Sequence, residues 1–420
     1  MIALKKVIAK IFEPKLRLVL IWILVGLLIR MLLMPLTTHA DLLSATWRES
    51  LYAFGGNFRI SGAVPEFLLC FYLKAVSPLT RELPGLFKPE FFTTGSINPN
   101  GYNLFVNSVH SARLLFVLKF PFLLTDLLLL FFAWKLFPDW TRKLRMVAFW
   151  ALCPLTLYSV YIWGRYEIFG LLFTFLALYF AYRNKSFWSL IFIGLALACR
   201  TSYLLILPFL VIYFSKNWKE AIKYSISGLL PVLLISQLIS FLGGGSLLPD
   251  LTLGDSYKLF FSGQIGSGFT TTSIFPVLYL LVLILFYYDK KRSFFKFSNY
   301  SAIAFLTYLS FGYFNPHYPV WIMPFLIIIF AQNRKTLLPM LGLFVSYFLF
   351  IEIYYGAAVS WTLFSPLDPS LFPNMSSLAA NHLLNIDRYL VVSIFHTLLV
   401  IFAGLLAFIL YKSRNETKPT

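Results

Sequence analysis

Apolar runs long enough to cross a membrane follow one another along most of the 420 residues, and short polar segments separate them. A membrane-spanning helix needs about 20 consecutive apolar residues, and the first such run covers Leu18 to Leu36. The strict alternation that marks the strands of a membrane β-barrel is not the pattern here. The chain is therefore predicted to be an all-α polytopic membrane protein, with a single integral membrane domain over residues 1–420 and no separate soluble domain.

Basic residues are grouped between the apolar runs rather than spread along the chain. Because Lys and Arg collect in the cytoplasmic loops of membrane proteins, we assign every group to that side. This assignment requires about 12 transmembrane helices with both chain ends in the cytoplasm, and the two short spans beside Arg200 are its least regular part. The groups lie at residues 5–17, 135–145, 183–185, 216–223, 290–296, 334–335 and 412–418.

Composition agrees with this assignment. Hydrophobic residues make up 59% of the chain and charged residues 12%, about half the charged fraction of a typical soluble protein, which is roughly 25%. A net charge of +18 would suggest nucleic acid in a soluble protein, but membrane topology accounts for it here, so we expect no nucleic-acid partner. Cys70, Cys153 and Cys199 lie in apolar surroundings and predict neither a disulfide framework nor a metal site.

The segment 37–110 is predicted to be an insert on the outer, non-cytosolic side. Its first part has the period of an amphipathic helix, which would lie on the membrane surface with its apolar face down. A second apolar helix is expected over Ala63–Val76. The apolar positions of the first helix are Leu43, Trp47, Leu51 and Phe54.

Unusual ionisable residues gather in the segments assigned to the outer side. Such groups at the rim of a helical bundle are costly unless they are paired or solvated, which makes them functional candidates. Arginine suits phosphate through its planar fork, and aromatic rings stack on sugars, so an anionic ligand that carries a ring is favoured. The set comprises Arg30, His39, Asp41, Glu66, Arg165, Glu167, Arg200 and His317.

Several short motifs carry a family resemblance. In chain order they are "HAD" at 39–41, "KFPFLLTD" at 119–126, "CPLTLYSVYIWGRYE" at 153–167, "ACRTSYLLILPF" at 198–209 and "FNPHYPVWIMPF" at 314–325. In order and sidedness they resemble the GT-C-fold glycosyltransferases, and most of all the GPI-type and asparagine-glycan mannosyltransferases. These enzymes use lipid-phosphate sugars and have helices lying on the membrane in their first outer loop.

The resemblance implies inverting transfer of a sugar, such as the hexose mannose, from a polyprenyl-phosphate donor to an acceptor hydroxyl on the outer or lumenal face. The acceptor would be a lipid-linked glycan, a glycolipid or a protein. The membrane would be the plasma membrane of a prokaryote or the endoplasmic reticulum of a eukaryote. Asp41 is the candidate general base, and fixed cations would stabilise the leaving phosphate. Those cations would be Arg165, Arg200 and His317, with Glu167, Tyr318, His39 and Arg30 as further substrate contacts.

No cofactor is expected, and metal dependence is left open, because Asp41 is followed by Leu42 and Leu43 and not by the paired acid of some relatives. Among other functions, a transporter or flippase of lipid-linked sugars or other anions is the alternative. Many transporters have inverted repeats with ionisable groups near the midplane. Here the polar residues gather at one rim and no halves match, which favours the enzyme.

Individual residues also have structural alternatives. Asp41 could simply cap the surface helix. Arg165 with Glu167 could be a local ion pair, and Arg30 and Arg200 could reach the interface from within a span. Asp126 is interpreted as a contact between helices rather than a catalytic group. The glycine-rich loop with Gly263, Gly266 and Gly268 could be a lid or a plain connector.

Overall fold

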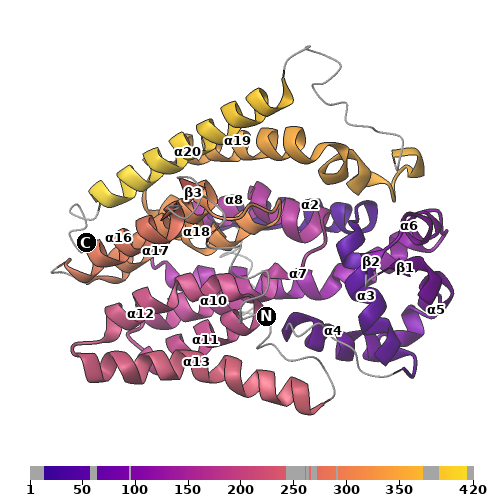
Figure 1. Ribbon diagram of the computed structural model, residues 1–420, viewed down its shortest axis with the longest axis horizontal. Helices are drawn as coiled ribbons and strands as arrows, with labels where there is room; N and C mark the ends of the chain where they lie inside the picture. The colour runs from indigo at the N-terminus through magenta and orange to yellow at the C-terminus, as the bar shows by residue number, and fades with distance from the viewer. Residues whose placement is uncertain are drawn as a thin grey trace.

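The computed structural model describes residues 14–56, 64–93, 96–242, 261, 264–265, 272–289, 292–371 and 387–413. Most of these residues are helical (Figure 1), which confirms the all-α prediction. The strands are two antiparallel pairs of two residues each, β1 (Phe92–Thr93) with β2 (Ser96–Ile97) and β3 (Gln264–Ile265) with β4 (Thr272–Ser273). The glycine-rich loop around Gly266 lies outside the described residues.

Within these described ranges, six helical stretches are long and apolar enough to cross a membrane. The first ends at Leu36, as the sequence predicts for the first span, and begins at Pro14, four residues before the predicted Leu18. The six are α2 (Pro14–Leu36), α7 (Ser111–Leu136), α8 (Trp140–Leu152) continued by α9 (Pro154–Thr156) and η3 (Leu157–Ile162), α13 (Trp218–Phe241), η7 (Arg334–Thr336) with α19 (Leu337–Tyr355), and α20 (Arg388–Ser413).

Shorter apolar helices complete the bundle, and twelve crossings remain a prediction. Two of these shorter helices flank Arg200, at the position of the two short spans that the sequence predicts. The shorter apolar elements are α10 (Glu167–Tyr182), α11 (Ser186–Cys199), η4 (Thr201–Leu205) with α12 (Leu207–Phe214), α16 (Ile274–Tyr287), and η6 (Tyr318–Ile322) with α18 (Met323–Gln332). Helix α17 (Phe294–Phe311), of 18 residues, packs between α16 and α20.

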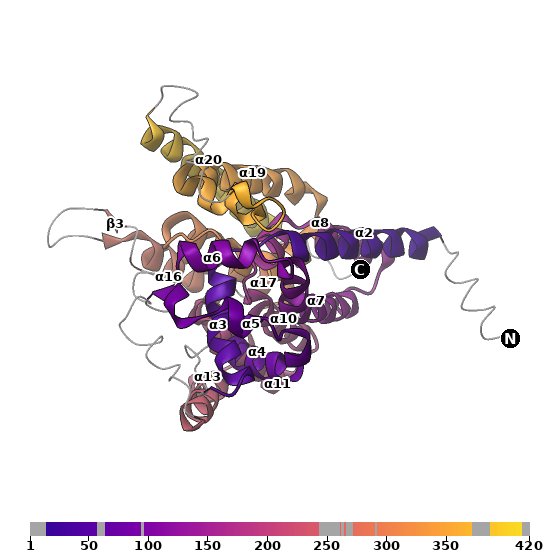
Figure 2. The same cartoon turned by 90° about the vertical axis from the view of Figure 1, so that its right-hand side faces the viewer.

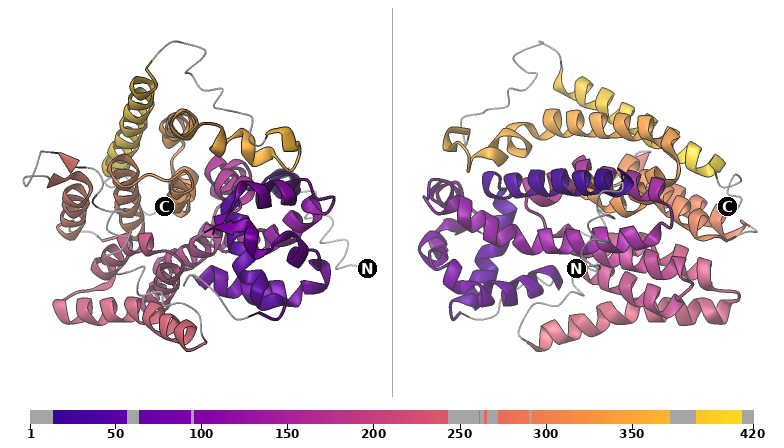
Figure 3. Two further views of the ribbon diagram at one scale, coloured as in Figure 1. Left: turned by 45° about the vertical axis from the view of Figure 1, so that its right-hand side comes forward. Right: turned by 180° about the vertical axis from the view of Figure 1, so that it is seen from behind.

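Close helix packing builds the core. Helix α10 packs on α11 and α7, and α2 packs on α8 and α7. At the crossing of α2 and α8, a Cβ on Gly26 would lie 2.6 Å from the ring of Trp150, so only glycine allows this approach. Helices α19 and α20 form a pair at one edge of the bundle, in both views of Figure 3. Cys70, Cys153 and Cys199 are free thiols buried in the protein.

The insert covers one end of the bundle, in indigo and purple in Figures 1 and 2. The segment after α19 reaches the same region, where Thr38 N–H donates to the carbonyl of Leu363 at 2.8 Å. The insert contains α3 (Ala40–Ala53), α4 (Val64–Ala75), η1 (Ser77–Leu79), α5 (Leu83–Leu86), η2 (Pro89–Phe91) and α6 (Pro99–Val106), and the later segment contains η8 (Gly356–Val359), η9 (Trp361–Phe364) and η10 (Pro369–Leu371).

Both helices predicted for the insert are present, and α3 is partly covered by the protein itself. Leu43 is fully buried, whereas Phe54, which caps the end of α3, is exposed. The side that packs against α4 carries Leu42, Thr46 and Glu49. Contact with α4 therefore decides which side of α3 is covered, a tertiary effect that the helical period alone does not contain.

Candidate functional site

Four segments far apart in the sequence bring predicted site residues to the same end of the helices. Asp41 follows the end of α2, and Arg165 follows the end of η3. Glu167 begins α10 and Arg200 follows α11, its antiparallel neighbour, so both lie at one end of this helix pair. His317 lies just before η6. The side-chain contacts described below join all of them into one cluster.

Asp41 holds the most exposed carboxylate of the cluster, with 40% of its side chain accessible. It does not cap α3. His39 does, because its Nδ1 accepts a hydrogen bond from the backbone N–H of Asp41 at 3.1 Å. The carboxylate is instead held from across the site, where Trp163 Nε1–H and Arg165 Nη1 both donate to Oδ2 at 3.2 Å. The structure thus removes the simple capping alternative for Asp41.

The turn that places Arg165 depends on Gly164. Pro154 interrupts the α8 helix, and η3, which follows, is a π-helix, a form often found at functional sites. Gly164 then has φ +86°, and a Cβ there would lie 2.8 Å from Leu42 Cδ2. Glycine adopts this left-handed conformation without cost. The chain can therefore turn Trp163 and Arg165 together towards α3.

Glu167 is the centre of the cluster and is fully buried. Its carboxylate lies 3.0 Å from Arg200 Nη2, 3.4 Å from His317 Nε2 and 3.6 Å from Arg165 Nε. A buried carboxylate at the first position of a helix is also favoured by the helix dipole. Glu167 therefore pairs locally with Arg165, as one interpretation of the sequence proposes, and in addition orients Arg200 and His317 from other segments.

Aromatic rings surround these charges. His39 stacks on Trp163 with centroids 3.9 Å apart, and the ring centroid of His317 lies 5.8 Å from that of Trp163. Tyr318, also a predicted contact, has its ring 4.8 Å from His317. Tyr166 lies below the guanidinium of Arg200, whose Cζ is 5.1 Å from the ring centroid. Cations over aromatic faces are stabilised in this arrangement.

Electrostatics set the charge state of the site. Burial alone would raise the pKa of Asp41, but the positive charge of Arg165, whose Nη1 lies 3.2 Å from Oδ2, holds it well below its usual range. Burial, together with the charges of Arg165 and Arg200, lowers the pKa of His317 to about 3. His317 is therefore neutral at pH 7, and the sequence-based assignment of a cationic His317 must be corrected.

The two guanidiniums remain charged. Burial would lower the pKa of Arg165 and of Arg200, but nearby Glu167 and Tyr166 raise both above the ordinary value. Two carboxylates, Asp41 and Glu167, balance these two cations. Within the described residues, buried Arg165 Nε, Arg200 Nε and His317 Nδ1 have no hydrogen-bond partner. Buried polar atoms are normally paired, so these three atoms lack the hydrogen bond that such atoms usually make.

A second polar chain links the cluster to the insert. Tyr166 OH accepts from Arg200 Nη2 at 3.4 Å and donates to Glu66 Oε1 at 3.3 Å. Arg48 Nη2 donates to the same carboxylate at 2.9 Å. Glu66 thus lies behind Tyr166, as an indirect support of Arg200.

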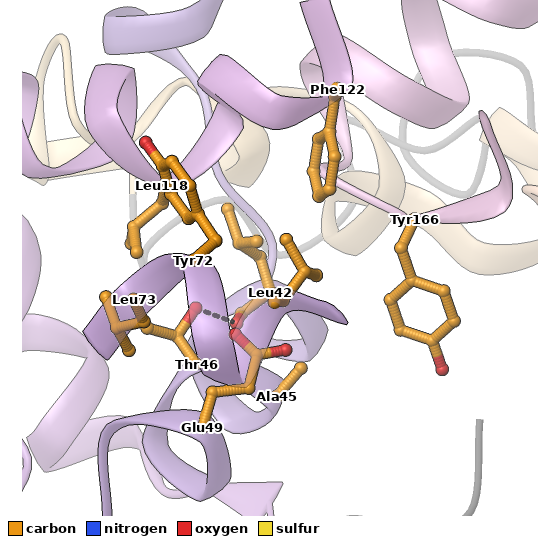
Figure 4. A pocket seen from close by; sticks show the side chains of 10 residues that line it. Leu42, Ala45, Thr46, Glu49, Tyr72, Leu73, Leu118, Phe122 and Tyr166 are labelled. Atoms are coloured by element: carbon orange, nitrogen blue, oxygen red, sulfur yellow. Dashed lines mark hydrogen bonds between the residues drawn. The ribbon is translucent and has the colours of Figure 1, made fainter. Parts of the chain in front are cut away.

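Next to this chain, sequence reasoning missed Glu49. It lines a small apolar pocket with Leu42, Tyr72 and Tyr166 (Figure 4), and its buried Oε1 has no hydrogen-bond partner among the described residues. Burial, with the charge of Glu66, raises its pKa well above the usual value. Nothing in the sequence around Glu49 distinguishes it from the solvated acids of a surface helix.

Arg30 lies apart from the other candidates. It is fully buried in α2, where Nε donates to Asp126 Oδ2 at 2.7 Å and Nη2 donates to the carbonyl of Trp150 at 2.8 Å. Its guanidinium also lies 3.9 Å from the centroid of the Trp150 ring. Asp126 thus joins helices, as its sequence interpretation states. The structure does not bring Arg30 to the Asp41 cluster.

An apolar groove runs between α8, α18 and α19 and encloses about 1250 Å³ of empty space, part of it open to the surroundings. Its walls include Leu152, Pro154, Phe330 and Leu341. Phe348 at its edge contacts Tyr158, with centroids 5.4 Å apart, and Tyr158 in turn lies 5.8 Å from Trp163. Aromatic contacts therefore connect the groove with the residue that holds Asp41.

Within the described ranges, no three His, Cys, Asp or Glu side chains are placed to share a metal ion. No family model matches the sequence, and comparisons with curated proteins and with solved structures give no significant match.

Proposed function

We propose that this protein is an inverting glycosyltransferase that moves a sugar, such as the hexose mannose, from a polyprenyl-phosphate donor to an acceptor hydroxyl. The acceptor would be a lipid-linked glycan, a glycolipid or a protein, and the reaction would take place on the non-cytosolic face. One observation carries the proposal. A partly exposed carboxylate, Asp41, lies 3.2 Å from Arg165, in one cluster with Arg200 and with buried N–H groups that lack partners.

This arrangement suits displacement at an anomeric carbon. Asp41 takes the proton of the acceptor hydroxyl as that oxygen attacks the anomeric carbon. The bond between this carbon and the phosphate oxygen breaks, and polyprenyl phosphate leaves. Its second ionisation has a pKa near ~6, so no protein acid has to protonate it.

Arg165 and Arg200 stabilise the charge that grows on the phosphate, and such a donor can contribute about 3 kcal/mol in a dry site. His317, being neutral, offers a hydrogen bond rather than a charge. When Arg165 turns to the phosphate, it leaves Asp41, and the pKa of Asp41 rises towards that of a useful base. The ion pair between Asp41 and Arg165 is thus the resting state of the catalytic group.

The groove beside α8 supports a lipid-linked donor. It lies along helices apolar enough to cross a membrane, and its rim side chains Leu341 and Val345 are about half exposed. A polyprenyl chain would cover them. The family resemblance of the sequence motifs points to the same donor class.

The test is transfer by purified protein supplied with polyprenyl-phosphate mannose and a set of lipid-linked glycan, glycolipid and peptide acceptors. Asp41→Asn keeps the side chain's size and removes the base, so we expect transfer to fall about 100-fold or more while donor binding persists. Asp139→Asn, an exposed cap of α8, is the matched control, because Asn caps a helix as well as Asp.

Equal transfer by the parent and Asp41→Asn would exclude Asp41 as the base. If the protein moved intact donor across the membrane of proteoliposomes without forming a glycosidic bond, it would be a carrier and not an enzyme.

A further inference from the structure

Lys119 is a fully buried lysine in the first half of α7 that the reaction outlined above does not use. Its Nζ donates to the carbonyl of Thr37 at 2.5 Å, to the hydroxyl oxygen of Thr37 at 3.1 Å and to the carbonyl of Tyr161 at 2.6 Å. All three acceptors are neutral oxygens. A lysine inside a membrane-spanning helix is costly unless it is paired. These three hydrogen bonds satisfy it, which makes Lys119 a candidate for a structural role near the site.

The two carbonyls belong to the segments that carry the site. Thr37 directly follows α2 and stands four residues before Asp41, whereas Tyr161 lies near the end of η3 and stands four residues before Arg165. The last carbonyls of a helix have no partner within it. The Lys119 side chain has more than one N–H donor, so it can satisfy both helix ends at once.

Asp126, at the other end of the "KFPFLLTD" motif that begins with Lys119, also bonds to Tyr161. Asp126 lies two turns after Lys119 on α7, and its Oδ2 accepts from the Tyr161 hydroxyl at 2.9 Å. Arg30 fixes that carboxylate in turn, at 2.7 Å. Tyr161 is therefore gripped at its hydroxyl and at its carbonyl. Only the carbonyl contact also ties it to Thr37, and hence to the segment of Asp41.

We infer that Lys119 is a positioning residue, which sets the distance between Asp41 and Arg165 by tying the carbonyl of Thr37 to that of Tyr161. Its effect on catalysis rests on the proposed function, but its effect on geometry does not. The inference accounts for the spacing of the "KFPFLLTD" motif, whose Lys119 and Asp126 hold two ends of one residue.

The geometric test uses protein labelled with 6-fluorotryptophan and ¹⁹F NMR. The Trp163 signal, assigned through Trp163→Phe, reports on Asp41, because Trp163 donates to its carboxylate. In the parent, Asp41→Asn should shift this signal. In a Lys119→Met background we expect that response to be lost. In Lys74→Met, which removes a lysine bonded to the carbonyl of Ala53 in the insert, it should persist.

An unchanged response in Lys119→Met would overturn the inference. If Lys119→Met does not fold, Thr37→Val serves instead. It removes the hydroxyl that bonds the Tyr161 carbonyl at 2.8 Å and should weaken the response in part, so full retention in this variant would contradict the inference.

Kinetics supply the second arm. A displacement of about 1 Å can cost about 100-fold in rate, so Lys119→Met should lower kcat by that order with little change in the KM for donor. A merely destabilised protein would lose active molecules and leave the ¹⁹F response of the folded fraction intact. If the parent transfers no sugar but the NMR result holds, the proposed function fails and the positioning role stands.

Discussion

At the residue scale, the site depends on pairs that meet over long sequence distances. Arg165 is 124 residues from Asp41 along the chain, and its Nη1 lies 3.2 Å from that carboxylate. Sequence patterns predicted that both face one side of the membrane, because each follows a span. They could not predict that Glu167 would hold Arg200 and His317 as well, since these partners are set by how α10, α11 and η6 pack.

The charge of His317 shows the same limit. An imidazole near carboxylates is usually expected to be protonated, and the sequence analysis therefore listed His317 among the cations. Burial and two nearby guanidiniums reverse the outcome. Only the three-dimensional environment contains this information.

A pH dependence follows from His317. Its pKa is about 3 in the folded protein and near 6.5 in an unfolded chain, so between these pH values the unfolded state binds a proton that the folded state does not bind. The contribution of His317 to the unfolding free energy is therefore fully present above pH 6.5 and is lost as the pH is lowered towards 3. Between pH 7 and pH 5 this group should cost about 2 kcal/mol, measured as the unfolding free energy in detergent.

His317→Gln should remove that share of the acid sensitivity. His110→Gln, at an exposed position, should retain it. An identical pH slope in the parent and in His317→Gln would show that this imidazole titrates normally.

At the scale of elements, helices were predictable where they bury a continuous apolar run. The span at α2 ends at Leu36, as predicted, because Thr37, Thr38 and His39 interrupt the apolar run there. The π-helix η3 was not predicted. Tyr161 within it bonds to Thr37, Lys119 and Asp126 from other segments, and no local sequence pattern encodes these contacts.

Gly164 tests the turn after this helix. Gly164→Ala should destabilise the protein by about 1–2 kcal/mol through its left-handed backbone, and by more through the contact with Leu42. Thermal unfolding in detergent measures the loss. Gly404→Ala in α20, where a Cβ has open space, should be neutral or slightly stabilising. A variant at Gly164 as stable as the parent would mean that the turn relaxes freely.

At the scale of the whole molecule, the sequence predicted an all-helical membrane protein, and the part of the chain that the structure describes agrees, with six helices that are long and apolar enough to cross a membrane. It also gathers the insert and most of the candidate residues at one end of the bundle. Arg30 is the exception, because α2 is long enough to bury it two turns below Thr37, beside Asp126. A residue's depth along a span was not readable from its neighbours in the sequence.

The burial of all three native cysteines has a practical consequence for experiments on orientation. Since Cys70, Cys153 and Cys199 are buried in the protein, a water-soluble maleimide should not react with the native chain and should label only a thiol introduced at the surface. With the protein produced in the plasma membrane of a bacterial host, we expect Val109→Cys, at a position 94% exposed, to react in intact cells. Lys185→Cys, between α10 and α11, should react only after the cells are permeabilised. The opposite labelling pattern would show that the protein has the reverse orientation in its membrane, with the Asp41 cluster on the cytosolic side.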